Sequence, residues 1–188
     1  KEACQETMKR AAEFYLHGSN KEQAVEYALA GRDWSLMQYA LETVGPELLA
    51  QGKMATLGRW LAELEQEGVA LTPKNLLLAG STSYRMGRIR KAQTCLNQAL
   101  ELFMESMDEA GYIRCMLEKA RIARDQVSLE ESCRLLEEVL PRLHVRHNQL
   151  WYTVVGERLH NLIFMGRYKE VLAICSEMIL SARQVQNR

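Results

Sequence analysis

Glycine recurs at the ends of helical apolar patterns. Because these glycines come at short intervals, the chain is limited to short, closely connected helices. Six glycines follow segments whose apolar residues repeat at helical spacing, where a left-handed residue ends a helix: Gly18, Gly31, Gly52, Gly68, Gly87 and Gly166. No segment alternates strictly over the length of a strand. Because the connections are very short, we expect neighbouring helices to run antiparallel.

Polar residues mark the helix starts. Three pairs have capping-box spacing, namely Asn20 with Gln23, Ser106 with Glu109, and Ser128 with Glu131. Thr72 is followed by Pro73, a cap with proline at the first helical position. Starts and stops together predict helices over 3–17, 21–30, 34–44, 46–51, 54–66, 73–86, 88–104, 107–125, 129–140, 149–165 and 168–182.

The composition excludes several classes of protein. The chain has 188 residues, 24 Lys and Arg against 24 Asp and Glu, and 47% apolar residues, which argues against disorder and against a dedicated polyanion binder. No stretch approaches the about 20 apolar residues that a membrane helix needs. The cysteines stand singly, which predicts free thiols and a cytoplasmic location; they are Cys4, Cys95, Cys115, Cys133 and Cys175. The opening at Lys1, without a signal-peptide pattern, is expected for a piece of a longer protein.

One segment has the pattern of a known helical repeat. It reads Leu76, Gly80, Tyr84, Gly87, Ile89, Ala92, Leu96, Ala99, Leu100 and resembles a tetratricopeptide repeat. The same frame places later turns at Val127 and Gly166, at spacings of 40 and 39 residues, against about 34 in that family. Val127 and Leu159 replace the small residues expected at their positions.

The repeat predicts an all-α fold of antiparallel helix hairpins stacked as a tetratricopeptide-like right-handed superhelix. Three elongated hairpins would occupy about 71–106, 107–147 and 148–188 of one continuous array. An ordinary helical bundle with accidental periodicity is the alternative.

A second resemblance covers the N-terminal third. It lies in four strings, Ala11–Tyr15, Glu22–Trp34, Gly45–Gly52 and Leu57–Leu61, which are similar to the segment that follows the ATPase and winged-helix modules in MalT-like, large ATP-binding LuxR-type transcriptional activators. The resemblance implies that residues 1–70 are linker hairpins and that the repeats after them sense an inducer. In such a parent protein, sensing is coupled to multimerisation and transcription activation, and the ATP-binding and DNA-binding regions lie elsewhere.

Catalytic and metal motifs are missing from the sequence. Gly52-Lys53 is followed by Met54, so it does not form a P-loop, and no GxGxxG, HExxH, GxSxG or CxxC occurs. We therefore expect no enzyme activity and no cofactor in this chain. His144, His147 and His160 lack suitably placed Cys or carboxylate partners, so no metal site is predicted.

The predicted binding surface is a cationic groove formed by the first helix of each hairpin. Tyr84 would be its apolar platform, and it would suit an acidic peptide, a carboxylate or a phosphorylated small molecule. Its predicted residues are Lys74, Ser81, Tyr84, Arg85, Arg114, Arg121, Arg124 and His160. In the alternative interpretation, Glu118 pairs with Arg114 and Arg121 and the face is only solvated.

The expected partners follow from these interpretations. They are a small-molecule inducer or a peptide or protein, together with other domains of the same regulator, and we expect no direct nucleic-acid contact and no membrane. The last helix keeps an apolar face with Leu172, Ile179 and Leu180, which could form a homodimer. The competing functional class is a free-standing tetratricopeptide adaptor that docks a protein tail.

Overall fold

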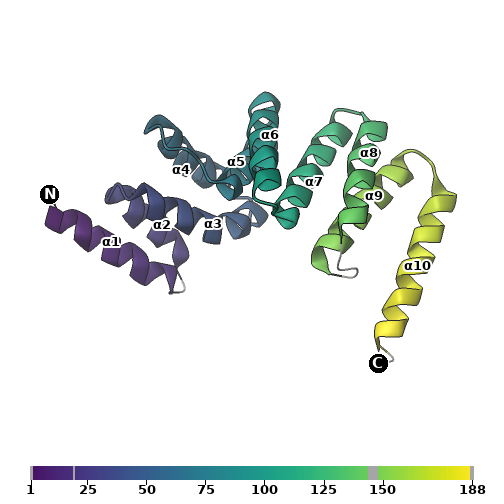
Figure 1. Cartoon of the computed structure of the whole chain (residues 1–188), viewed down its shortest axis with the longest axis horizontal. Helices are drawn as coiled ribbons and strands as arrows, with labels where there is room; N and C mark the ends of the chain where they lie inside the picture. The colour runs from purple at the N-terminus through teal and green to yellow at the C-terminus, as the bar shows by residue number, and fades with distance from the viewer. Residues whose placement is uncertain (1, 19, 144–147, 187–188) are drawn as a thin grey trace. The chain divides into compact units, whose positions relative to one another are not determined.

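The computed structural model describes residues 2–18, 20–143 and 148–186 (Figure 1). This part of the chain contains ten α-helices, one short 3-10 helix and no strand, which confirms the predicted all-α class. It forms two compact units, Lys1–Cys115 and Met116–Arg188, and the boundary falls inside one helix. Each unit is described by itself.

Unit 1 is built from six complete helices and the first part of a seventh. They are α1 (Glu2–Leu16), α2 (Lys21–Ala30), α3 (Trp34–Ala50), α4 (Met54–Gln66), α5 (Pro73–Arg85), α6 (Ile89–Glu105) and the start of α7 (Glu109–Asp125). Each helix from α1 to α6 packs against its neighbour in the chain, and α3 also contacts α5. Met37, Leu41, Leu57, Trp60 and Leu64 are the largest side chains buried in its core.

Helix α3 runs without a break from Trp34 to Ala50, so the predicted division into 34–44 and 46–51 is wrong. Pro46 lies inside this helix and cannot donate to the carbonyl four residues before it. The helix continues because apolar residues on both sides of the proline are buried in one core, with Val44 before it and Leu48 after it. Gly45 is also buried, directly against Leu78 of α5.

Four turns between helices share one backbone conformation at a glycine. Gly52, Gly68, Gly87 and Gly166 have φ angles of 67° to 78°, as predicted. At Gly87, the N–H donates to the Tyr84 carbonyl at 2.9 Å and the next N–H, of Arg88, donates to the Ser83 carbonyl at 2.8 Å. This pattern is a Schellman motif, and it satisfies carbonyls that the helix end leaves unpaired.

Three turns have the same conformation without glycine. Val127 has a φ of 63° and repeats the hydrogen bonds of Gly87, which confirms the turn that the repeat frame places there. Met107 and Arg32 both have a φ of 54°. Gly31, by contrast, is right-handed at −80°, because the turn begins one residue later, and Gly18 is not left-handed either.

Side-chain caps differ from the predicted ones at several helix starts. Thr72 Oγ1 accepts a hydrogen bond from the Asn75 N–H at 3.3 Å, as expected. Asn20 and Ser128 precede α2 and α8 but make no side-chain cap bond. Ser106 ends α6 instead of starting α7, because Asp108 lies closer and caps α7 by accepting from the Gly111 N–H at 2.9 Å.

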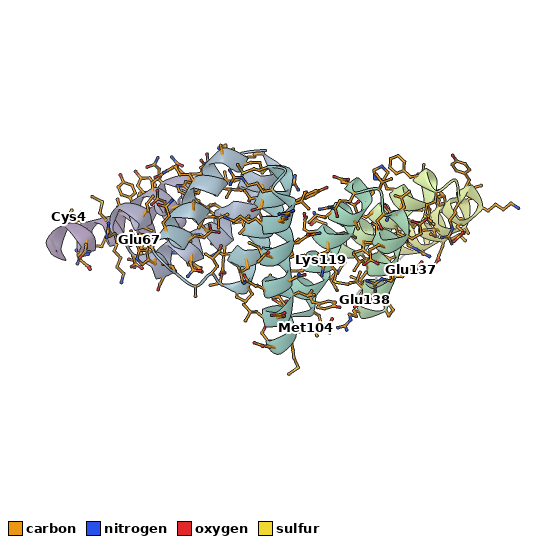
Figure 2. The ribbon with its side chains drawn as sticks, turned by 90° about the horizontal axis from the view of Figure 1, so that it is seen from above. Cys4, Glu67, Met104, Lys119, Glu137 and Glu138 are labelled. Atoms are coloured by element: carbon orange, nitrogen blue, oxygen red, sulfur yellow. The ribbon has the colours of Figure 1, made fainter. Side chains whose placement is uncertain are left out.

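Small residues let the helices of unit 1 approach closely. A β-carbon built on Gly80 of α5 would lie 2.7 Å from the Leu96 side chain of α6, and one built on Gly111 of α7 would overlap the Phe103 ring of α6. Ala92 and Ala99 of α6 are fully buried. Helix α6 buries one face in this way, while Met104 near its end is exposed (Figure 2).

Unit 2 contains the rest of α7, then α8 (Leu129–Val139), the 3-10 turn η1 (Leu140–Arg142), α9 (Gln149–Phe164) and α10 (Tyr168–Gln186). A buried polar chain connects three of its helices. Asn161 Nδ2 of α9 donates to Ser132 Oγ of α8, and that hydroxyl donates to the Ala120 carbonyl of α7, each at 2.7 Å. Because all three groups are buried, these two hydrogen bonds fix the relative positions of α7, α8 and α9.

Candidate functional site

Three residues of the predicted groove come together in unit 2. Arg121 and Arg124 lie on α7, and Arg124 Nη1 is 3.3 Å from His160 Nδ1 on α9. The His160 ring also contacts the ring of Phe164, with centroids 4.8 Å apart. His160, Phe164 and neighbouring Ile163 are exposed, so this surface carries apolar side chains beside its cations.

Glu157 of α9 joins the two arginines. Its Oε1 accepts a hydrogen bond from Arg121 Nε at 2.6 Å, and its Oε2 accepts one from Arg124 Nη1. Burial alone would raise the pKa of Glu157, but the hydrogen bonds from Arg124 and Arg121 outweigh it and hold the pKa below its usual range. The carboxylate is therefore ionised at neutral pH and offsets much of the local positive charge.

Glu118 is a second carboxylate in the same cluster. Its side chain is 9% exposed, and its Oε1 accepts a hydrogen bond from Arg121 Nη1 at 2.7 Å. Its Oε2 is buried without a hydrogen-bond partner in the described part of the chain. Burial opposes the charge on Arg121, yet Glu118 and Glu157 raise the pKa of that guanidinium. Of the two pairs in the alternative interpretation, Glu118–Arg121 forms, whereas the structure gives no ion pair for Arg114 among the described residues.

The other predicted groove residues lie in unit 1. Lys74 Nζ is 3.5 Å from Glu42 Oε2. The other oxygen of this carboxylate, Glu42 Oε1, accepts a hydrogen bond from Thr72 Oγ1. Ser81 is buried and Tyr84 is half-buried, so neither has the exposure expected of a groove surface. Arg85 and Arg114 are exposed, and the described residues offer neither of them an ion-pair partner. The groove as one surface stays a prediction.

Glu157 and Phe164 were missed in the sequence, although the repeat frame contains a signal for the former. Glu157 follows Glu118 by 39 residues, which is the distance from Val127 to Gly166. The two glutamates therefore occupy equivalent positions on the first helices of successive hairpins. Because a lateral pair between repeats depends on helix packing, only the structure identifies Arg121 and Arg124 as the partners of Glu157.

The remaining candidates for chemistry are the histidines and the cysteines. Among the described residues, no group of three or more His, Cys, Asp or Glu side chains could hold a metal ion, while His144 and His147 lie outside those residues. Burial raises the pKa of the Cys95 and Cys133 thiols, which keeps them protonated. No helix in the described ranges has the length and apolarity to cross a membrane.

Comparison with known proteins defines the fold. No protein-family profile and no curated protein matches the sequence. Two crystal structures from Podosopora anserina, ascribed to a kinesin light chain with nearly identical TPR-like repeats, do match the structure. One, a substituted variant, has a TM-score of 0.64 and 14% identity over 97% of this chain and 96% of its own. The other has a TM-score of 0.62 and 14% identity over 97% of both chains. This likeness confirms that the chain has a tetratricopeptide-like helical-repeat fold.

Proposed function

We propose that the chain is the signal-sensing and protein-interaction domain of a bacterial ATP-dependent LuxR-type regulator similar to the MalT-like activators. In this proposal, binding of an inducer or partner to the repeats is coupled to multimerisation and transcription activation. The domain itself is non-enzymatic and cytoplasmic, carries no cofactor and makes no direct contact with nucleic acid. ATP and DNA bind to other parts of the parent protein.

The regulator assignment draws on the four strings in the N-terminal third. In the structure several of their residues pack the first four helices: Ala12 of α1, Ala24 and Ala28 of α2, and Trp60 of α4 are buried. Trp60 Nε1 also donates to Glu26 Oε1 of α2 at 3.0 Å. Part of the strings therefore serves packing, and their order along the chain, followed by the repeats, supports the proposal.

The interaction surface is the face of the first helices. The observation that carries this part is the pair of exposed arginines in unit 1, Arg85 on α5 and Arg114 on α7, which have no ion-pair partner among the described residues. Unpaired guanidinium groups bind carboxylates and phosphates bidentately. The partner is accordingly an acidic peptide segment, a carboxylate or a phosphorylated small molecule.

The reading frame around the chain separates the regulator from a free-standing adaptor. The regulator requires an upstream G-x-x-x-x-G-K-[ST] motif and a downstream helix-turn-helix in the same frame. If both are present, deletion of residues 71–188 should abolish inducer-dependent transcription from the cognate promoter in a reporter strain. A frame that lacks both motifs would contradict the proposal and favour the adaptor.

A further inference from the structure

Two cavities lie at equivalent positions of the repeat, one in each unit. Gly166 follows Gly87 by 79 residues, and this offset maps α5 and α6 onto α9 and α10. The cavity of unit 1 is lined by Leu76, Cys95 and Gln98, among others. The cavity of unit 2 is lined by the three residues at the same offset, Val155, Ile174 and Glu177. Both cavities therefore arise from the same arrangement of helices.

The two hairpins differ at the positions that decide how closely their helices pack. In unit 1, Ala79 of α5 and Ala99 of α6 are buried and small. Their equivalents in unit 2 are Arg158 and Met178, and both line the cavity there. A core position of the repeat thus holds a cation in the second hairpin, and ordinary packing does not require one.

The cavity of unit 2 has the size and lining of a small-molecule site. Its volume is about 360 Å³, within the range of ligand pockets. Trp151, Val155 and Arg158 of α9 line it together with Ile174 and Met178 of α10 and Leu140 of η1. The surface is thus mainly apolar, with a guanidinium at one side.

The guanidinium of Arg158 has few hydrogen-bond acceptors around it in the described part of the chain. Its side chain is 25% exposed, and its Nε is buried without a hydrogen-bond partner in the described ranges. Its Nη2 lies 3.5 Å from Glu137 Oε1 of α8, at the limit of a hydrogen bond (Glu137 is labelled in Figure 2). A half-buried guanidinium with one long contact retains donors for an acceptor that the chain itself does not supply.

We propose that this cavity binds a small monocarboxylate with an apolar or aromatic body. The carboxylate accepts hydrogen bonds from the Arg158 guanidinium, and the body packs against Trp151, Ile174 and Met178. The binding itself is independent of the groove, and the inference rests on the proposed function only in treating this ligand as the sensed signal.

Two probes of the same shape test the proposal on the full chain. Phenylacetate and phenylacetamide differ in charge but hardly in size, so isothermal titration calorimetry isolates the contribution of the carboxylate. We expect phenylacetate to bind at least about tenfold more tightly than phenylacetamide. Arg158→Gln should remove this difference. Arg90→Gln, which removes an exposed arginine of α6 in unit 1, should retain it.

Three results would overturn the proposal. They are equal affinity of the wild-type chain for the two probes, no binding of phenylacetate, hexanoate or indole-3-acetate up to about 5 mM, and unchanged phenylacetate binding by Arg158→Gln. The wild-type comparison decides the matter even if Arg158→Gln fails to fold, which circular dichroism would reveal. Failure here would leave the groove untouched, because Arg85 and Arg114 lie in unit 1 and are tested with a different probe.

Discussion

Glu157 on α9 accepts a hydrogen bond through Oε1 from Arg121 Nε on α7, at 2.6 Å. The two residues belong to the first helices of successive hairpins, and both are mostly buried, with side chains 17% and 22% exposed. The contact stabilises the stack of repeats and uses donors of Arg121 that a partner would otherwise reach. In the predicted groove, Arg121 is therefore better suited to support the surface than to contact a ligand.

Replacing Glu157 by Gln should destabilise unit 2 by about 2 kcal/mol at pH 7, because two guanidinium groups lose a charged acceptor. The low pKa of Glu157 means that the unfolded chain binds a proton before the native chain does. The wild-type free energy of unfolding therefore decreases as pH falls from about 5 through the native pKa. The loss should be shallower in Glu157→Gln, so that the two stabilities converge in acid.

Urea unfolding between pH 7 and pH 3 measures this effect. The matched control is Glu101→Gln, an exposed glutamate of α6 without an ion pair among the described residues, which should change stability by less than about 0.5 kcal/mol. Parallel pH curves for the wild type and Glu157→Gln would contradict the assignment.

The left-handed turn at Val127 predicts a stabilising substitution. A β-branched residue with a φ of 63° is strained, and this side chain is 86% exposed, so it contributes little packing in return. Val127→Gly should raise the free energy of unfolding by about 1 kcal/mol. Met107→Gly, at an equally exposed but unbranched position, should give a smaller gain. Thermal melts compare the two variants, and a loss of stability in Val127→Gly would show that the turn is not strained.

Two helical glycines should respond to alanine in opposite directions. A β-carbon on Gly111 would overlap the buried Phe103 ring, so Gly111→Ala should destabilise the chain by about 2 kcal/mol. A β-carbon built on Gly156 in α9 would have no atom of another helix within 4 Å. Gly156→Ala should therefore stabilise the chain by about 0.5–1 kcal/mol through helix propensity. Chemical denaturation measures both, and equal effects would contradict the packing of α7 on α6.

The last helix should promote self-association of the chain in solution. Leu172, Ile179 and Leu180 of α10 are 53–67% exposed, so this helix presents large apolar side chains to solvent. Light scattering after size exclusion should give a dimer that Leu172→Glu converts to a monomer. Lys169→Glu, also exposed on α10, should leave it intact. A wild-type monomer at all concentrations would contradict the predicted homodimer.

The helices and turns could be predicted from the sequence because their signals are local. Gly87 and Gly166 are left-handed because glycine, which lacks a β-carbon, adopts this conformation without strain. The repeat frame predicts the same turn at Val127. The break predicted at Pro46 was wrong because tertiary packing on both sides of it outweighs the lost hydrogen bond. Ser106 was misplaced as a cap because α6 runs on to Glu105.

The candidate sites depend on contacts between repeats and were less predictable. Arg121 and Glu157 are 36 residues apart, and only helix packing brings them together. In the repeat frame, Arg158 is the equivalent of Ala79, and this difference can be read from the sequence. The cavity beside Arg158, in contrast, is visible only in the folded hairpin. The spacing of Arg114, Arg121 and Arg124 assigns these three cations to one helix face. Only the structure shows that Arg121 and Arg124 are paired with Glu157 and that Arg114 has no ion pair among the described residues.

The most direct test of the interaction surface is fluorescence anisotropy with a labelled peptide of alternating Asp and Glu, at about 0.15 M ionic strength to screen weak attraction. The wild type should bind this peptide and not its Asn and Gln counterpart, and the double variant Arg85→Glu, Arg114→Glu should weaken binding at least about tenfold. The control Arg88→Glu, Arg90→Glu carries the same change in charge outside the predicted groove and should bind like the wild type. Equal losses in the two double variants, or binding that survives in the first, would contradict the proposed docking face.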